Sequence, residues 1–177
     1  DDLLADTGSG HNVVATVFIE CRSAYRSDGP EELRPAGEME FVAAIADEAE
    51  RRGTTRVAEG IVGFADLTLG DRVEPVLEAL REASGGRLRG IRHAAGWDAD
   101  PVIGNAHHGG GQGLYLQDDF RRGLRRLSEA GLALDALVYH PQHADLLALA
   151  RACPEATVVM NHTGMPLGYG VYAGKRE

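Results

Sequence analysis

Three short apolar runs of this sequence each finish in a histidine. The runs are Leu88–His93, Leu134–His140 and Thr157–His162, and turn-forming residues bound them, which is typical of buried β-strands. If these strands are parallel, their carboxyl ends meet at one edge of a sheet, where ligands bind in parallel α/β folds. Imidazole rings can bind a metal ion or polarise a carbonyl group. The sequence therefore predicts a site at this edge, with His140 and His162 as its catalytic or metal-binding residues.

The two last histidines could act as a pair. Neighbouring parallel strands lie about 5 Å apart, so His140 and His162 at equivalent strand ends could share one divalent ion such as zinc or manganese. The alternative is that each histidine only makes hydrogen bonds at the end of its strand, with no metal. His107 and His108 are a weaker metal candidate, because they lie in a Gly-rich loop whose backbone is not preorganised.

Other polar residues at strand ends could bind a substrate. Arg92 and His93 are adjacent, so the alternation of a strand sends them to opposite sides and only one can face the site. We favour Arg92, because a guanidinium can bind a carboxylate through two hydrogen bonds, and keep His93 as a second substrate-binding candidate. Glu20 closes the first predicted strand and could be a base, a ligand or a partner for a histidine. Gln142 follows His140 closely and is also predicted to bind substrate.

Five predicted strands alternate with four predicted helices. The strands span residues 12–20, 56–65, 88–93, 134–140 and 157–162. The helices carry apolar stripes over residues 39–49, 73–80, 120–127 and 146–150. Asp71 with Glu74 resembles a capping pair for the second helix, and Asp118 or Asp119 is expected to cap the third. This alternation indicates βαβ units and a parallel sheet.

The length of the chain limits the possible folds. A (β/α)8 barrel usually takes about 250 residues, and five parallel strands cannot close one. The sequence therefore predicts an α/β fold, an incomplete (β/α)8 TIM barrel in which residues 1–177 form a single domain and further strands lie outside them. The alternative is an open, doubly wound parallel sheet. The two longest loops, 21–38 and 94–117, both follow the carboxyl end of a strand, which agrees with a site there.

Composition narrows the functional classes. The formal net charge of −9 argues against a nucleic-acid surface. No run of 18 apolar residues and no signal-peptide pattern is visible, so we expect a cytoplasmic protein that acts on a small molecule and not on a membrane. Cys21 and Cys153 lack CxxC spacing and are expected to be buried free thiols. Open strand edges would favour a homo-oligomer.

Three phrases of the chain resemble a known family. Gly90–His93, Val138–Gln142 and Val158–Gly164 are similar to motifs of the amidohydrolase superfamily, specifically its amidohydrolase-2 branch of metal-dependent TIM-barrel hydrolases, which includes sugar-lactone and pyrone-dicarboxylate lactonases. The resemblance runs over nearly the whole chain. It implies that the five strands are the second to the sixth of the barrel.

The resemblance also implies roles for particular residues. His140 would be the fifth-strand histidine, His162 the sixth-strand histidine, and Arg92 a substrate-binding residue at the end of the fourth strand. The first-strand His-x-His pair and the eighth-strand aspartate of the family have no counterpart here, so the segment alone is expected to be inactive. We expect a lactonase that opens a small carboxylated cyclic ester. The alternatives are a metal-dependent decarboxylase or hydratase of the same superfamily, or a non-catalytic binding protein.

Overall fold

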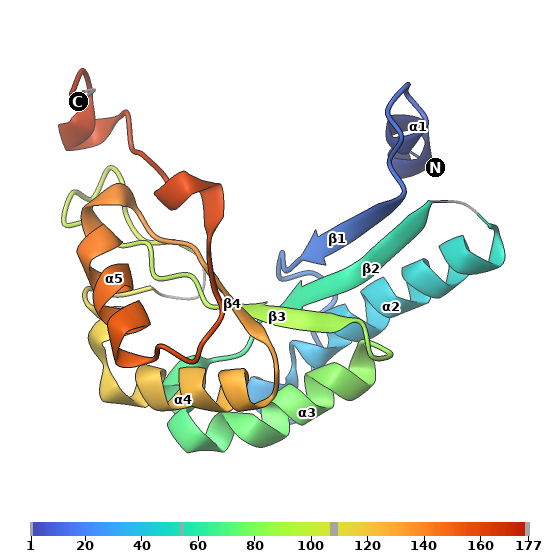
Figure 1. Ribbon diagram of the computed structural model, residues 1–177, viewed down its shortest axis with the longest axis horizontal. Helices are drawn as coiled ribbons and strands as arrows, with labels where there is room; N and C mark the ends of the chain where they lie inside the picture. Colours follow the sequence, from blue (N-terminus) through green and yellow to red (C-terminus); the bar gives the residue numbers. More distant parts are fainter. Residues whose placement is uncertain (1, 54, 107–109, 176–177) are drawn as a thin grey trace. The chain divides into compact units, whose positions relative to one another are not determined.

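The computed structural model describes residues 2–53, 55–106 and 110–175, so the paired histidines His107 and His108 lie outside the described residues. The strands are β1 (Ala15–Ile19), β2 (Arg56–Gly63), β3 (Leu88–Arg92), β4 (Ala133–Ala136) and β5 (Val158–Met160). They form a sheet in the order β1-β2-β3-β4-β5, and the pairs β1–β2 and β4–β5 are parallel (Figure 1). A doubly wound sheet would reverse its strand order at a switch point, whereas a TIM barrel keeps the order of the chain. The prediction of an incomplete TIM barrel is confirmed.

Five helices accompany the strands in the described part of the chain. They are α1 (Asp2–Thr7), α2 (Ala36–Arg51), α3 (Glu74–Ala83), α4 (Asp118–Glu129) and α5 (His143–Ala152). Three 3-10 segments matter for the site: η2 (Leu67–Val73), η5 (His140–Gln142) and η6 (Asn161–Gly164). The chain divides into two compact units, the first formed by Asp1–Phe64 with Val76–Gly90 and the second by Ala65–Pro75 with Ile91–Glu177. The expectation of a single domain stays a prediction.

In the first unit, α2 packs against β2. The helix buries Met39, Val42 and Ala46, and Met39 lies so close to Gly63 that a Cβ there would be 2.8 Å from its Sδ. A side chain at position 63 would therefore displace the flexible end of the Met39 side chain, and glycine leaves room for it. β1 lies at the edge of the sheet and leaves Val17 61% exposed.

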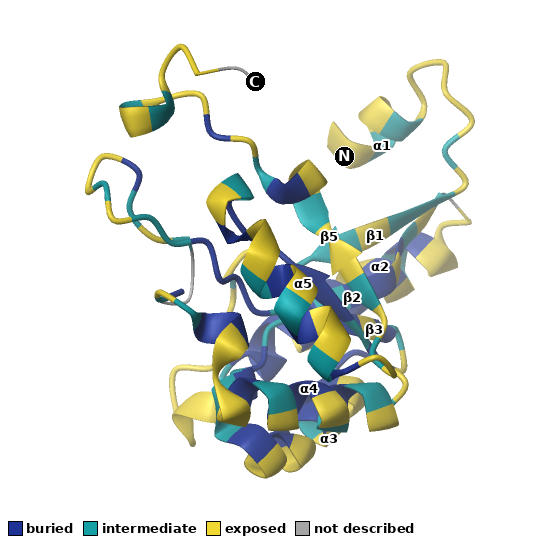
Figure 2. Ribbon diagram, turned by 60° about the vertical axis from the view of Figure 1, so that its left-hand side comes forward, coloured by how far each residue is buried: buried dark blue, intermediate teal, exposed yellow. Residues whose placement is uncertain are grey.

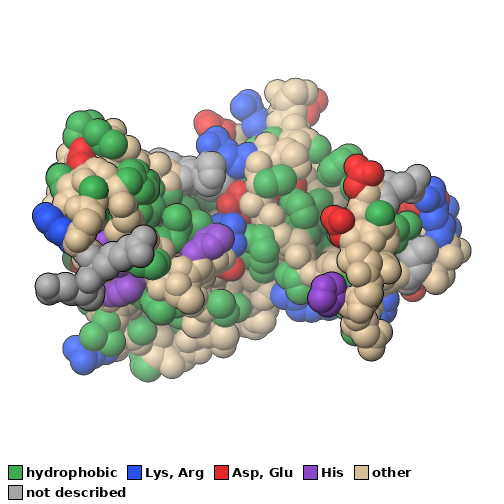
Figure 3. All heavy atoms as spheres, turned by 90° about the horizontal axis from the view of Figure 1, so that it is seen from above, with side chains coloured by type: hydrophobic (Ala, Val, Ile, Leu, Met, Phe, Trp, Pro, Cys, Tyr) green, Lys and Arg blue, Asp and Glu red, His purple; other side chains and the backbone are tan. Residues whose placement is uncertain are grey.

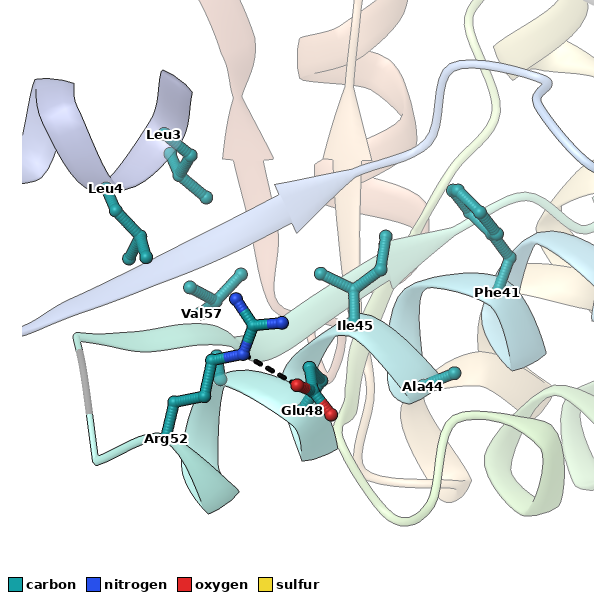
Figure 4. Close-up of a pocket in the computed structure, with 9 residues that line it drawn as sticks. Leu3, Leu4, Phe41, Ala44, Ile45, Glu48, Arg52 and Val57 are labelled. Carbon is teal, nitrogen blue, oxygen red and sulfur yellow. Dashed lines mark hydrogen bonds and ion pairs between the residues drawn. The ribbon is translucent and has the colours of Figure 1, made fainter. Parts of the chain in front are cut away.

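A second apolar face of α2 lines a groove in the same unit. The groove has a volume of about 350 Å³ and is lined by Leu3, Leu4, Phe41, Ala44, Ile45, Glu48, Ala49, Arg52 and Val57 (Figure 4). Phe41 and Ile45 are 51% and 44% exposed. An ion pair between Arg52 Nε and Glu48 Oε1, 2.6 Å apart, closes the polar end of this wall. The helix thus carries apolar side chains on its outer face as well as on the face that meets the strand.

In the second unit, α4 packs closely against η2. The helix is buried along one face and exposed along the other (Figure 2), and its buried residues include Phe120, Leu124 and Leu127. A Cβ at Gly123 would lie 2.2 Å from the carbonyl oxygen of Leu67. The absence of a side chain at position 123 is therefore what lets the helix approach the backbone of η2.

Two predicted helix caps are wrong. The residue before α4 is Gln117, which makes no capping hydrogen bond. Asp118 and Asp119 lie inside the first turn of the helix, where the positive end of the helix dipole stabilises their negative charge. Asp71 does not cap α3 but accepts a hydrogen bond from Arg126 Nε at 2.9 Å. The local cap belongs to Asp66, whose Oδ1 accepts from the backbone N–H of Thr68 at 2.9 Å at the start of η2.

The two cysteines are free, as expected, but only Cys153 is buried. Cys21 is exposed, which corrects the expectation of burial, because it lies in the loop after β1 and not in a strand. Over the described ranges, none of the helices has the length and apolar character needed to cross a membrane.

Candidate functional site

The histidine-bearing strands end earlier than the sequence predicted. β4 ends at Ala136, and the chain then runs through three buried residues before His140 opens η5. β5 ends at Met160, and His162 lies within η6. The strand register pairs Ala136 with Met160, so His140 lies farther beyond its strand than His162 does. The expectation that the two histidines occupy equivalent strand ends is therefore wrong.

His140 is held by the segment that follows η6. Its Nδ1 accepts a hydrogen bond from the backbone N–H of Leu167 at 3.2 Å, and its ring meets the ring of Tyr172 edge-on at 4.6 Å. An accepting Nδ1 carries no proton, so the proton of the neutral ring is on Nε2. In this tautomer His140 offers a hydrogen-bond donor and no free lone pair for a metal. Within the described residues, no group of three or more His, Cys, Asp or Glu side chains could hold a metal ion.

His162 lies in a left-handed turn. His162, Thr163, Gly164 and Met165 have φ values of 47°, 52°, 73° and 40°, a conformation that costs a residue with a Cβ about 1–2 kcal/mol. His143 supports the turn, because its Nε2 lies 3.0 Å from the carbonyl oxygen of Gly164. The side chain of His162 is exposed, and histidines reach the surface on the face seen in Figure 3. The turn thus presents an imidazole to solvent beyond the end of β5.

A buried charge pair joins β3 to β4, and an amide side chain directly after β5 binds to it. Arg92, the last residue of β3, donates from Nε to Oδ1 of Asp135 in β4 at 2.8 Å. Asn161, directly after β5, donates from Nδ2 to both oxygens of Asp135 at 2.8 and 3.0 Å. The side chains of Arg92 and Asp135 are 13% and 11% exposed. Sequence reasoning found Arg92 but missed Asp135 and Asn161.

His93 turns to a different neighbour from Arg92, as strand alternation predicts. Its Nδ1 accepts from the backbone N–H of Leu67 at 3.1 Å, and its ring packs 5.4 Å from that of Phe120. The hydroxyl of Tyr115 donates to the carbonyl oxygen of His93 at 3.2 Å. Burial raises the pKa of Tyr115 well above its usual range, and the negative charge of Asp135 adds to the effect. His93 is only 3% exposed, and its ring thus holds the start of η2 in place through the hydrogen bond from Leu67.

Gln142 and Glu20 are buried, and both are engaged with backbone groups. The Oε1 of Gln142 accepts from the N–H of Trp97 at 2.8 Å, and its Nε2 donates to the carbonyl oxygen of Ala95 at 2.8 Å. Gln142 therefore holds the loop that follows β3. Glu20, in the first unit, continues the β1–β2 ladder by donating its N–H to the carbonyl oxygen of Val62 at 2.8 Å. Substrate contact stays a prediction for both residues.

Comparison with known proteins points to one family. A protein-family model described as Amidohydrolase matches residues 25–175. A relative from Sinorhizobium fredii, named uncharacterized protein y4mH, is 29% identical over 172 residues, which cover 93% of this chain and 49% of the relative. The crystal structure of an amidohydrolase from Burkholderia multivorans with bound HEPES matches with a TM-score of 0.58 at 23% identity, over 92% of this chain and 46% of that one.

This chain thus spans about half the length of the relatives that it matches. At 23% identity, the likeness to the solved structure shows the fold, a TIM-barrel arrangement of strands and helices. The family model covers most of the sequence, including all the residues of the second unit that carry the site. The chain belongs to the amidohydrolase family.

Proposed function

We propose that the protein is a hydrolase of the lactonase type, which opens a small cyclic ester carrying a carboxylate. Membership of the amidohydrolase family supports hydrolysis as the reaction class. Arg92 lies at the carboxyl end of β3, and His140 and His162 lie beyond the carboxyl ends of β4 and β5. These positions support a site at this face, where barrels of this kind place their catalytic groups.

The observation that carries the proposal is the incomplete hydrogen bonding of the Arg92 guanidinium. Its guanidinium is largely buried and uses Nε to bind Asp135, and the described part of the chain gives its two terminal nitrogens no hydrogen-bond partner. A guanidinium has five N–H donors in a fixed fork, and the terminal nitrogens of Arg92 are not among the buried unpartnered atoms of the described residues, so they are open to solvent and to a ligand. A substrate carboxylate supplies two acceptors with matching geometry, so it would complete the hydrogen bonding of Arg92.

In the proposed reaction, the Nε2–H of His140 donates to the carbonyl oxygen of the lactone and stabilises the charge that develops there. A water molecule forms the new bond to the carbonyl carbon, and His162 takes its proton, since imidazole accepts and returns protons near neutral pH. The ring C–O bond then breaks, and the proton passes to the ring oxygen, which leaves a hydroxy acid. The His140 tautomer does not fit a metal ligand. The proposed steps therefore use no zinc or manganese ion.

The test compares two lactones that differ in one charge. Full-length protein is assayed with 5-oxotetrahydrofuran-2-carboxylate and with the corresponding carboxamide, and ring opening is followed by proton release. We expect the carboxylate to be the better substrate. The Arg92→Ala variant should lose this preference, while Arg126→Ala, which removes an exposed arginine from α4, should keep it. Unchanged turnover when both His140 and His162 are replaced by alanine would refute the mechanism.

A further inference from the structure

We infer that Asp135 is a positioning residue: it fixes the direction in which Arg92 presents its guanidinium, and Asn161 in turn fixes Asp135. This inference rests on the proposed function of Arg92 as the anchor for a substrate carboxylate. Neither Asp135 nor Asn161 stands out in the sequence as a site residue. Their contacts define how a ligand can approach.

The arrangement leaves one approach open. A carboxylate can meet a guanidinium along the side formed by Nε and one terminal nitrogen, or at the end formed by both terminal nitrogens. Asp135 already occupies Nε at 2.8 Å. A ligand carboxylate is therefore received end-on, through the two terminal nitrogens of Arg92. This geometry favours a carboxylate whose plane continues that of the guanidinium.

Asn161 makes the orientation of Asp135 definite. Its amide nitrogen binds both carboxylate oxygens, at 2.8 and 3.0 Å, so rotation of the Asp135 carboxylate would break at least one hydrogen bond. Asn161 carries no charge, so the cluster consists of one cation and one anion. A second carboxylate at position 161 would instead repel Asp135 across a buried contact.

Charge and orientation predict opposite effects for the same change. The negative charge of Asp135 repels an incoming carboxylate, so by charge alone the Asp135→Asn variant should bind the substrate more tightly. If Asp135 acts by orienting Arg92, the same variant should bind it more weakly, because a misaligned group can cost about a hundredfold. The sign of the effect therefore decides between the two roles.

The experiment measures kcat and KM of the full-length protein for the carboxylate and carboxamide lactones. We expect Asp135→Asn to raise KM for the carboxylate by about tenfold to a hundredfold, with little change in kcat and little change for the carboxamide. The exchanged double variant, Asp135→Asn with Asn161→Asp, keeps the net charge of the cluster and should show the same loss. Asp71→Asn is the control, since Asp71 binds Arg126 Nε at 2.9 Å in an equivalent but exposed pair.

A lower KM in Asp135→Asn, or wild-type kinetics in the exchanged variant, would overturn the inference. A second measurement does not depend on catalysis. The N–H signal of Arg92 Nε, identified by its loss in Arg92→Lys, should shift and exchange faster with water in both variants. If the Arg92 Nε–H signal changes in this way in both variants while the wild-type protein opens neither lactone, the proposed function fails and the positioning role stands. If the signal is unchanged, the positioning role fails whatever the kinetics.

Discussion

Replacing Gln142 by alanine tests whether one buried amide holds the loop after β3. Gln142 is 7% exposed, accepts from the N–H of Trp97 and donates to the carbonyl oxygen of Ala95, each at 2.8 Å. The Gln142→Ala change leaves both backbone groups without these partners. An unsatisfied buried polar group costs about 1–3 kcal/mol, and partial access of water to a shortened side chain reduces the loss. We therefore expect the free energy of unfolding to fall by about 2–4 kcal/mol.

Urea denaturation measures this loss, and hydrogen exchange at the Trp97 amide shows where it arises. The control is Gln117→Ala, which removes an exposed glutamine that makes no capping bond at the start of α4. The Gln142→Glu variant adds a pH test, because its new carboxyl group can donate to Ala95 only when protonated. The folded state then raises the pKa of that carboxyl, so its contribution is present at low pH and is lost as pH rises through the folded pKa. A Gln142→Ala protein with wild-type stability and unchanged Trp97 exchange would refute the reasoning.

Two further predictions concern the second unit. Gly123→Ala should destabilise the protein by about 1–3 kcal/mol despite the better helix propensity of alanine, because the new Cβ would lie 2.2 Å from the carbonyl oxygen of Leu67. Urea denaturation measures this loss of stability, and a gain in stability would contradict the close packing. Burial raises the pKa of Tyr115, so its contribution to stability is present below the unfolded pKa of about 10 and is lost as pH rises above it. Burial also raises the pKa of Tyr25, so absorbance titration near 295 nm should show two tyrosines whose ionisation is delayed until unfolding, and one of them should be missing in Tyr115→Phe.

The order of elements could be predicted from the sequence, but the strand ends could not. Apolar runs located all five strands and helical spacing located α2 to α5, because burial imposes periodicity on the sequence. The run Leu137–Tyr139 stays buried after β4 has ended, and it satisfies its backbone differently, for example when the carbonyl oxygen of Leu137 accepts from Ala95. A buried segment that is not a strand has the same apolar sequence as a strand, so the sequence alone cannot distinguish the two. For this reason the predicted strand ran on to His140, although β4 ends at Ala136 and His140 begins η5.

Some site residues could be predicted from the sequence and others could not, for a similar physical reason. Arg92 could be found because a charge at the end of an apolar run suggests a ligand contact. Asp135 had a readable signal as well, since an aspartate between Leu134 and Ala136 in a buried strand must find a partner. Its partners could not be predicted, because they depend on the register that places Asn161 beside β4. The tautomer of His140 likewise depends on Leu167, a contact that no local pattern encodes.

The sequential strand order also bears on how the chain reaches its fold. Every strand pairs with the next one along the chain, as Ala15 does with Arg56 and Leu134 with Val158. Each new pairing then closes a loop of only a few tens of residues, for which the entropy of loop closure grows slowly with length. During synthesis the sheet can therefore be extended one strand at a time, each newly made strand docking on the one before it. Val159 and Met160 of the edge strand β5 are 51% and 49% exposed, so they leave apolar surface on the last strand of this series.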